Sequence, residues 1–500
     1  MRPTYNPPVA WTVTTLRLIG ALVAGIMAAF GYPPYEWTSL AWLGLVGFVW
    51  LVATAGTRPV ALWCGYLFGL AYFAVILSWL IEVELIAYYP LAMVQALAFL
   101  IVAGGIFRYR DAAPWVFIVA TAGAAALAEF LRVRWPFGGF PWGSIGVMAG
   151  ATPLRPSAQW FGATGWGVLL AAVAAVSVLV IRRRCSWRVL AAASGAVVLL
   201  GLAGNVWPAI PEGETRSVTI VQGNSPCPGT RCPGERRLIY ESHLALTSML
   251  EPGPDLVVWP ESSTGGSADP LRDPSVAEAI GAEAVRLDAT LLVGGDLDAG
   301  PDHFENINVV FGPSGAVVGS YRKRHPVPFG EYVPLRPLFE IVPALDRVPR
   351  DMIRGREQVL FDLDGVRFGS VISYEGAYAR YEREAVRAGA AFLVLATNEA
   401  SFGRTPASDQ LIAISRMRAA ELGVDLVHAA VTGKSAFVYA DGRVEGLTGL
   451  FETTTADGAP AARTAGPTLY VRWGDWLQVG AMLGYLGLRA AGRFRREEPT

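Results

Sequence analysis

The stretch LLAAVAAVSVLVI, residues 169–181, contains no charged side chain and no polar stripe, and VLAAASGAVVLLGLAG at 189–204 has the same character. A helix on the surface of a soluble protein is apolar on one face only, at a period of about 3.6 residues. These two stretches are apolar on every side. They predict helices that are surrounded by lipid rather than by water.

The same pattern repeats along the first two fifths of the chain. Crossing a hydrocarbon core of about 30 Å takes roughly 20 helical residues, and seven apolar segments have that length. A weaker eighth, WLQVGAMLGYLGLRA at 476–490, is short and carries Arg489. We therefore expect an α-helical transmembrane bundle with about eight spans. The first seven are placed near 13–32, 37–56, 60–81, 90–107, 112–131, 162–181 and 188–207.

The overall composition agrees with a membrane protein. Of 500 residues, 53% are apolar and 17% are charged, whereas soluble proteins average about 25% charged residues. The 41 Lys and Arg nearly balance the 42 Asp and Glu, for a net charge of -1. This composition excludes a disordered chain and offers no basic surplus for nucleic acid.

Loop charges predict the orientation, because Lys and Arg accumulate on the cytoplasmic side of a membrane. The loops at 33–36 and 82–90 carry Glu but neither Lys nor Arg. We therefore expect both termini in the cytoplasm and the long segment 208–474 outside it. The arginines on the predicted inner side are Arg2, Arg58, Arg108, Arg110, Arg182, Arg183, Arg184, Arg188, Arg489, Arg493, Arg495 and Arg496.

One loop departs from this pattern. Arg132, Arg134 and Arg155 lie on the predicted outer side. We expect these arginines to have a local role, such as binding lipid phosphates at the headgroup level.

The segment 208–474 is a different kind of sequence, with ordinary charge density and alternating strands and helices. Such alternation predicts an α/β domain in which helices cover the sheets. We therefore divide the chain into a bundle at 1–207, an α/β domain at 208–474, and a last span with a basic tail at 475–500. The expected strands are SVTIVQG (217–223), DLVVWPES (255–262), ATLLVGGD (289–296), NINVVFG (306–312), VRFGSVISYE (366–375) and AAFLVLATN (390–398), and the expected helices are 236–250 and 274–288.

Functional groups in α/β folds gather at the carboxyl ends of strands. Glu261, Ser373 and Asn398 lie at such ends. They are therefore the first candidates for chemistry.

Three motifs carry the most specific signal: WPESS at 259–263, YRKRHPVPFGEYVP at 321–334 and ISYEGAYAR at 372–380. In order and spacing they resemble the catalytic motifs of the nitrilase superfamily, whose fold is an α-β-β-α sandwich. Together with the spans, the chain resembles the bacterial apolipoprotein N-acyltransferases over nearly its full length. Further matching stretches are WPFGGFPWGSIG (135–146), TNEASFG (397–403) and YVRWGDW (470–476).

The resemblance implies roles for individual residues. Breaking a phospholipid ester and passing the acyl group to an amine needs a nucleophile, a base and an oxyanion partner. Glu261 is then the base, Lys323 stabilises the oxyanion, and the Tyr374 backbone N–H completes the oxyanion hole. Glu331 and Glu375 are expected to orient Lys323 and to balance its charge.

The resemblance also implies the partners. The acyl donor is a phospholipid and the acceptor is the diacylglyceryl-cysteine of a lipoprotein, in the bacterial plasma membrane and without a cofactor. Trp135, Phe137 and Trp142 are expected either to form an interfacial aromatic belt or to help admit acyl chains. Asn398 is a further candidate for substrate binding.

The chain departs from the family at the nucleophile, where Ser373 stands in place of Cys. A hydroxyl must lose its proton during attack, whereas a thiol is partly ionised at neutral pH. Three explanations stay open: a natural serine variant that still acylates, an inactive relative, or a deliberately introduced substitution. An inactive relative would act as a membrane scaffold for an enzyme such as a polyprenyl-phosphate mannosyltransferase, to which some relatives are fused. A soluble amidase of the wider superfamily is a further alternative, but such an enzyme would not need the membrane spans expected here.

Two of the four cysteines, Cys227 and Cys232 in CPGTRCP, lie on the predicted outer side. An oxidising compartment and the Pro-Gly turn between them favour a disulfide. A metal site is not expected, because the four histidines are scattered. Of these, His428 is interpreted as structural.

Overall fold

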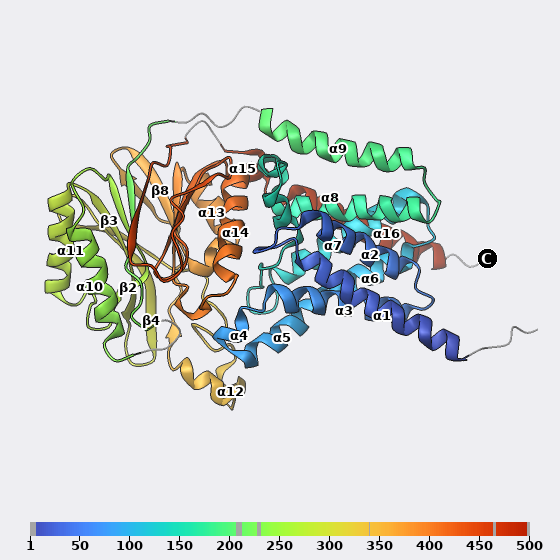
Figure 1. The fold of residues 1–500 in the computed structure, drawn as a ribbon, viewed down its shortest axis with the longest axis horizontal. Helices are drawn as coiled ribbons and strands as arrows, with labels where there is room; N and C mark the ends of the chain where they lie inside the picture. The colour runs from blue at the N-terminus through green and yellow to red at the C-terminus, as the bar shows by residue number, and fades with distance from the viewer. Residues whose placement is uncertain (1–6, 207–212, 228–231, 340, 464–466, 498–500) are drawn as a thin grey trace, which may run out of the picture. The chain divides into compact units, whose positions relative to one another are not determined.

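The computed structural model describes residues 7–206, 213–227, 232–339, 341–463 and 467–497 (Figure 1). The chain divides into two compact units: Met1–Asn205 with Trp473–Thr500, and Val206–Arg472. The first unit is helical and the second contains both sheets. Arg2 and the expected boundary at 207–208 lie outside the described residues.

The helical unit is held together by close approaches between helix backbones. A Cβ on Gly25 would lie 2.3 Å from the carbonyl oxygen of Phe68, and one on Gly123 would lie 2.3 Å from that of Ala481. Only glycine permits these crossings, which are typical of helices packed in lipid. The helices are α1 (Pro7–Ala29), α2 (Thr38–Ala53), α3 (Arg58–Ile76), α4 (Leu80–Val83), α5 (Leu85–Ala96), α6 (Ala98–Tyr109), α7 (Pro114–Arg132), α8 (Ala158–Ile181), α9 (Trp187–Val206) and α16 (Trp476–Glu497), with the 3-10 turns η1 (Ile145–Ala151) and η2 (Arg155–Ser157).

Seven of the eight expected spans each correspond to one helix, and the fourth is divided between α5 and α6. Six helical segments of the described chain are long and apolar enough to cross a membrane. The second expected span forms only the 16-residue α2, about 24 Å long at 1.5 Å per residue. The eighth, α16, continues beyond Arg489 to Glu497 and is not among the six. A count of eight spans stays a prediction.

The loop expected at 82–90 is wrong. Helix α5 begins at Leu85 and contains Pro90, and with α6 it forms an apolar segment from Leu85 to Tyr109. A proline removes one backbone hydrogen bond, which membrane helices tolerate where neighbours satisfy the freed carbonyl. The expected span therefore begins too late, because α5 already begins at Leu85.

The expectation that Arg132 binds lipid phosphates is also wrong. Its side chain is buried, and its Nη2 lies 2.8 Å from the Glu129 carboxylate. The remaining donors reach Gln95 Oε1 at 3.3 Å and the carbonyl oxygens of Phe140 and Trp142 at 2.6 and 2.7 Å. The guanidinium is therefore satisfied inside the helical unit.

The other two arginines of this loop also have partners within the unit. Arg155 donates to the Gly150 carbonyl at 2.8 Å. Arg134 lies 3.8 Å from Asp475, but 40% of its side chain is exposed. Contact with lipid phosphate stays a prediction for Arg134.

A cavity of about 80 Å³ lies beside the Glu129–Arg132 pair, lined by side chains of α2, α3, α6, α7, η1, α8 and α16. Thr121 and Gln478 line it, and both are 1% exposed. Within the described residues, Thr121 Oγ1 and Gln478 Oε1 have no hydrogen-bond partner. The cavity therefore combines apolar walls with unsatisfied polar atoms.

The second unit contains two mixed sheets, and all six strands expected from the sequence are present in it. The first sheet has the order β13-β1-β2-β3-β4-β5, with β6 beside β4, and the second has the order β12-β11-β10-β9-β8-β7. The strands are β1 (Val218–Gln222), β2 (Leu256–Gly265), β3 (Thr290–Asp298), β4 (His303–Phe311), β5 (Val317–Arg322), β6 (Asp351–Met352), β7 (Leu360–Leu363), β8 (Val366–Ile372), β9 (Phe392–Thr397), β10 (Asp425–Ala430), β11 (Ala436–Val438), β12 (Val444–Glu445) and β13 (Thr454–Gly458).

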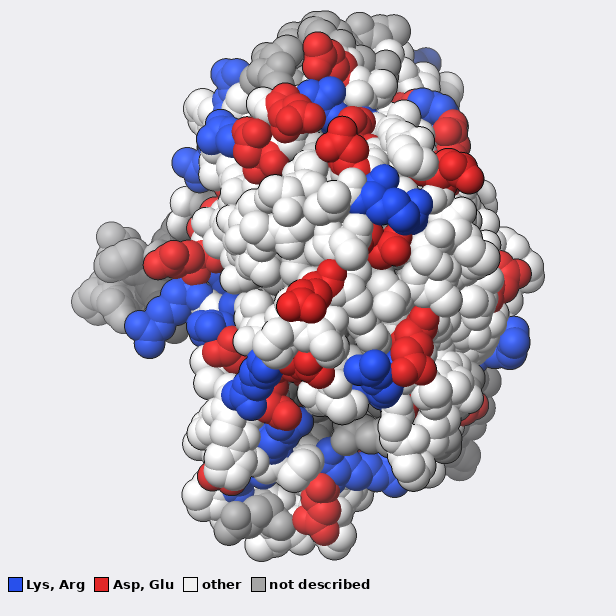
Figure 2. Space-filling model, turned by 90° about the vertical axis from the view of Figure 1, so that its left-hand side faces the viewer, with Lys and Arg blue, Asp and Glu red and all other residues white. Residues whose placement is uncertain are grey.

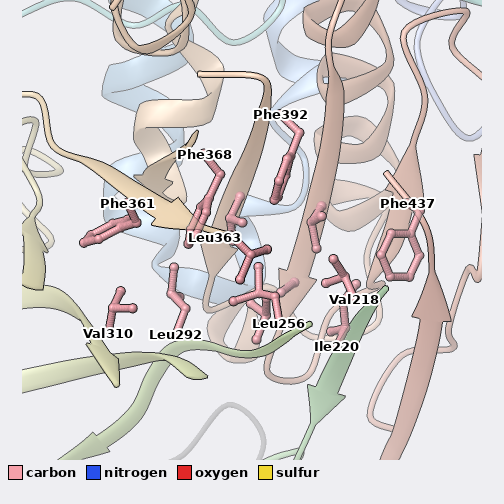
Figure 3. Close-up of a cluster of buried hydrophobic side chains, with 14 of the residues drawn as sticks. Val218, Ile220, Leu256, Leu292, Val310, Phe361, Leu363, Phe368, Phe392 and Phe437 are labelled. Atoms are coloured by element: carbon pink, nitrogen blue, oxygen red, sulfur yellow. The ribbon is translucent and has the colours of Figure 1, made fainter. Parts of the chain in front are cut away.

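The two sheets pack face to face. Ile220 and Leu256 of the first sheet and Phe368 and Phe392 of the second point into one apolar core (Figure 3). Each strand therefore gives alternate side chains to this core.

Helices cover the outer face of each sheet. Buried apolar residues of α10 (Glu235–Ser248) and α11 (Pro274–Leu287) pack on the first sheet, and those of α13 (Ala379–Arg387) and α14 (Ala407–Leu422) pack on the second. The α-β-β-α sandwich is therefore confirmed. The remaining short elements are α12 (Arg336–Phe339), η3 (Pro343–Arg347), η4 (Ser373–Ala377), η5 (Ala400–Phe402) and α15 (Leu469–Trp473).

The surface charge of this unit is mixed. Figure 2 shows the face at the left of Figure 1, where acidic and basic side chains are interspersed. The described residues of this face form no continuous basic patch of the kind that nucleic acid binding uses.

Candidate active site

Strands from both sheets position the candidate residues. Glu261 lies within β2, and Lys323 directly follows β5. Ser373 directly follows β8, and Asn398 directly follows the parallel neighbour β9. Lys323, Ser373 and Asn398 therefore lie at strand ends, whereas the expectation that Glu261 ends its strand is wrong, because β2 continues to Gly265.

The Glu261 carboxylate is buried and accepts three hydrogen bonds. Its Oε1 accepts from Asn306 Nδ2 at 2.6 Å and from Lys323 Nζ at 3.2 Å. Its Oε2 accepts from the Asn398 backbone N–H at 2.6 Å. Burial raises the pKa of Glu261 above its usual value, although the Lys323 charge and the Asn306 hydrogen bond oppose this. A raised pKa makes the carboxylate a stronger base.

Lys323 is completely buried between two carboxylates. Its Nζ lies 3.2 Å from Glu261 Oε1 and 2.6 Å from Glu331 Oε1. Burial lowers the pKa of Lys323, but the charges of Glu261 and Glu331 outweigh it, so the pKa is raised overall. The ammonium is therefore a permanent positive charge in a site from which water is excluded.

Ser373 has a strained backbone. Its φ is +52°, in the left-handed region that non-glycine residues rarely adopt. It is half-buried, at the turn from β8 into η4. In the part of the chain that the structure describes, its hydroxyl makes no hydrogen bond. A sharp, strained turn between a strand and a helix is typical of serine nucleophiles.

Glu375 does not hydrogen-bond to Lys323, as judged on the described residues. Its carboxylate accepts instead from the backbone N–H groups of Ile372 at 2.9 Å, Arg324 at 2.7 Å and His325 at 3.1 Å, and from the Tyr321 hydroxyl at 2.9 Å. Burial raises the pKa of Glu375. Glu375 therefore connects residues 324–325, which follow Lys323, to Ile372, the residue before Ser373.

His325 lies in an aromatic cluster beside this carboxylate. Its Nε2 and Nδ1 each lie 3.0 Å from a tyrosine hydroxyl, of Tyr378 and Tyr381 respectively. Burial and the nearby Arg380 charge lower the pKa of His325 to about 3. Tyr374 packs its ring 5.7 Å from the imidazole. This histidine is therefore neutral at physiological pH.

Asn306 is a site residue that the sequence reasoning missed. It lies on β4, is 2% exposed, and also approaches Glu331 Oε1 at 3.4 Å. A second asparagine on the same face of the strand, Asn308, donates to Ser370 Oγ at 2.7 Å. The sequence could have indicated Asn306, because two asparagines interrupt an otherwise apolar strand and buried amides require hydrogen-bond partners.

The aromatic candidates belong to the helical unit. Trp135 is 68% exposed and Phe137 is 38% exposed, whereas Trp142 is 3% exposed and packs 5.2 Å from Trp79. Contact with acyl chains stays a prediction for the first two only. Trp142 has a packing role in the bundle.

A disulfide joins Cys227 and Cys232, whose Cα atoms are 6.1 Å apart. It lies in the connection between β1 and α10. Cys64 and Cys185 are free thiols.

Two stretches match known families. Residues 24–176 match the apolipoprotein N-acyltransferase N-terminal domain, and residues 217–464 match carbon-nitrogen hydrolase. Apolipoprotein N-acyltransferase of Methylococcus capsulatus is 32% identical over 498 residues, which cover 95% of this chain and 96% of the relative. That of Nitrosomonas europaea is 32% identical over 496 residues, which cover 94% and 96%.

Among solved structures, a carbon-nitrogen hydrolase superfamily protein from Xanthomonas campestris is 21% identical. The match covers 54% of this chain and 96% of that protein, with a TM-score of 0.39.

Proposed function

The chain belongs to the apolipoprotein N-acyltransferase family, and we propose that it transfers an acyl chain from a phospholipid to the α-amine of a lipoprotein diacylglyceryl-cysteine. Family membership confirms the resemblance drawn from the three motifs and makes the chain a bacterial membrane acyltransferase. The proposal concerns the route by which a chain with Ser373 carries out this transfer.

In the first half-reaction, Ser373 Oγ attacks the ester carbonyl carbon of the phospholipid while its proton passes to Glu261. Lys323 stabilises the tetrahedral oxyanion, an effect of about 3–4 kcal/mol per donor in comparable sites. When the intermediate collapses, the bond to the glycerol oxygen breaks and Glu261 returns the proton to that oxygen. The lysophospholipid leaves, and the acyl chain remains as an ester on Ser373.

In the second half-reaction, the neutral α-amine of the acceptor attacks the acyl ester. The amine proton passes to Glu261, and Lys323 again stabilises the oxyanion. The bond to Ser373 Oγ breaks, Glu261 protonates that oxygen, and an amide is released. An α-amine has a pKa of about 8, so a useful neutral fraction exists at neutral pH.

The observation that carries this proposal is the buried ammonium of Lys323, with one carboxylate at 3.2 Å and another at 2.6 Å. Burying such a cluster is costly, and apolar residues would serve stability as well or better. A protein that acted only as a scaffold would have no use for it. The raised pKa of Glu261 also suits a hydroxyl nucleophile, which needs a stronger base than a thiol.

The loop arginines support a topology with both termini in the cytoplasm and the α/β unit on the extracytoplasmic side. Both substrates are anchored in the membrane, so they would reach the site laterally. The exposed Trp135 and Phe137 are the candidates for contact with acyl chains.

The test is a two-substrate assay with the purified full-length protein, labelled phospholipid and a diacylated lipopeptide. We expect N-acylated lipopeptide from the parent and none from Glu261→Gln or Ser373→Ala. We expect Ser373→Cys to be at least about tenfold faster, because a thiol is the better nucleophile. Without lipopeptide, mass spectrometry should find the acyl chain on the peptide that contains residue 373.

Equal product from the parent and Ser373→Ala would rule out an acyl-enzyme at this residue. A silent parent with an active Ser373→Cys would show an intact site with an impaired nucleophile. Silence in both would reject catalysis and leave the scaffold role, with a polyprenyl-phosphate mannosyltransferase as the partner to test.

A further inference from the structure

A buried pair of side chains lies next to the residue that holds the proposed base. His428 on β10 and Glu399, just after β9, are 0% and 1% exposed, and His428 Nε2 lies 3.4 Å from Glu399 Oε1. Ser415 Oγ on α14 lies 2.9 Å from His428 Nδ1. Because a carboxylate only accepts, the Nε2 atom carries a proton. The pair therefore connects the helix layer to the loop after β9.

That loop is a compact turn that starts at the active site. The Asn398 side chain accepts a hydrogen bond from Ala400 N–H at 3.0 Å, and the Glu399 carbonyl accepts from Phe402 N–H at 3.0 Å. The Asn398 backbone N–H donates to Glu261 Oε2 at 2.6 Å. A movement of Glu399 is therefore expected to shift the Asn398 N–H, which donates to Glu261.

The Glu399 carboxylate has little freedom to move. A Cβ on Gly433 would lie 2.2 Å from Glu399 Oε2, so the strand connection after β10 closes one side of the carboxylate. Within the described residues, this Oε2 has no hydrogen-bond partner. His428 is therefore the polar group on which the orientation of this side chain depends.

We propose that Glu399 and His428 are positioning residues that hold the Asn398 N–H against the carboxylate of Glu261. The consequence for catalysis rests on the proposed function, in which Glu261 is the base. The geometric part, that the pair fixes the Asn398 N–H, can be tested without any turnover.

The same strand provides a matched control. Asp425, at the other end of β10, forms an equally buried pair with Arg463 at 3.0 Å. Asp425→Asn should also lower stability, because it removes one member of an equally buried polar pair. It should not affect the Asn398 N–H, and it therefore separates positioning from general stability.

The first measurement uses the Ser373→Cys protein, in which alkylation of the introduced thiol is followed against pH by peptide mass spectrometry. A thiol that gives its proton to Glu261 reacts faster once that carboxylate is ionised. Loss of a hydrogen bond to the ionised form raises its pKa. Glu399→Gln and His428→Gln should therefore move the midpoint of the profile upward by about half to one pH unit. Asp425→Asn should not move it.

The second measurement is hydrogen–deuterium exchange of the segment 396–403 in the same variants. Glu399→Gln and His428→Gln should speed exchange at least about tenfold, which corresponds to a loss of about 1.4 kcal/mol of protection. Asp425→Asn should leave exchange in this segment unchanged. If Glu399→Gln does not fold, Glu399→Asp replaces it, and the expected direction is the same.

The inference is overturned if exchange in this segment is unchanged in the pair variants, or if Asp425→Asn accelerates it equally. A different failure would concern the proposed function. If Glu261→Gln leaves the alkylation profile unchanged, Glu261 is not the base. The exchange result would still decide whether the pair positions Asn398.

Discussion

The backbone N–H of Asn398 donates to Oε2 of Glu261 at 2.6 Å, and this bond joins the two sheets of the sandwich. Glu261 belongs to the first sheet and Asn398 follows a strand of the second. The proposed base is therefore complete only when the sheets are packed together. Changes that loosen the packing between the sheets should reduce activity before they unfold the protein.

Ser373→Gly should stabilise the protein although it removes the proposed nucleophile. The φ of +52° is strained for serine but not for glycine. Relief of about 1–3 kcal/mol is partly offset by about 0.4–1 kcal/mol for the more flexible unfolded chain. Thermal unfolding of the full-length protein should show a net gain, whereas Ser370→Gly, on the preceding strand with an ordinary φ, should lose stability. A loss in both would contradict the strain.

Lys323→Met should unfold more easily and lose activity. It leaves the buried carboxylate of Glu261 and the partly buried carboxylate of Glu331 without their cation, at a cost of about 3–5 kcal/mol. Lowering the pH should restore part of the stability, because burial raises the pKa of Glu261 and this carboxylate then becomes neutral. Chemical denaturation at pH 7 and pH 5 measures this, and an identical deficit at both values would contradict the charge argument.

Stability should fall as the pH drops below about 6.5, through two buried histidines. Burial lowers the pKa of His243 to about 4 and that of His325 to about 3, against 6.5 when unfolded. The unfolded state then binds more protons, so the contribution is full above pH 6.5 and is lost as the pH approaches the folded pKa. For His243 this amounts to at most about 3 kcal/mol. His243→Gln should flatten the dependence of the melting temperature on pH between 4 and 6.5, whereas an unchanged slope would contradict the assignment.

Breaking the ion pair inside the helical unit should cost more than removing it. Arg132→Met leaves the partly buried Glu129 carboxylate without its cation, with an expected loss of about 3 kcal/mol. The double variant Arg132→Met/Glu129→Leu should recover at least half of that loss. Thermal unfolding of the parent, Arg132→Met, Glu129→Leu and the double variant forms a double-mutant cycle, and additive losses would show that the pair has no net coupling.

The disulfide should stabilise the α/β unit modestly. Closing so short a loop gives about 2 kcal/mol in the chain-entropy model. Cys227→Ser should lower the melting temperature, and a reducing agent should lower that of the parent equally. Cys185→Ser, a free thiol in the helical unit, is the control that should have no effect.

The architecture was largely predictable from the sequence. Strands rich in Val and Leu gave clear boundaries because they are buried on both faces, and the uncharged helices indicated lipid in the same way. The errors fell where one residue was interpreted alone. Pro90 was taken to begin the fourth span, whereas helix α5 already begins at Leu85, and Arg132 was taken to face lipid although its partners include Gln95 of another helix.

The site was predictable only as a set of motifs. The sequence named Glu261, Lys323 and Glu331 but not Asn306, whose amide contacts two of the carboxylates. Asn398 was named as a candidate for substrate binding, which stays a prediction, but the hydrogen bond from its backbone N–H to Glu261 was not expected. Backbone donors and strand neighbours are set by register between distant segments, which one sequence does not display.

The four hydrogen bonds of Glu375 have a mechanical consequence. Three of them join the backbone after Lys323 and the backbone before Ser373 to a single carboxylate, and the fourth comes from the Tyr321 hydroxyl. The Lys323 ammonium and the Ser373 hydroxyl are therefore expected to move together. Their separation should stay constant during thermal motion and while the phospholipid donor is replaced by the lipoprotein acceptor. Such a frame would also tolerate the replacement of the attacking atom itself, with oxygen in place of sulfur, without any rebuilding of its surroundings.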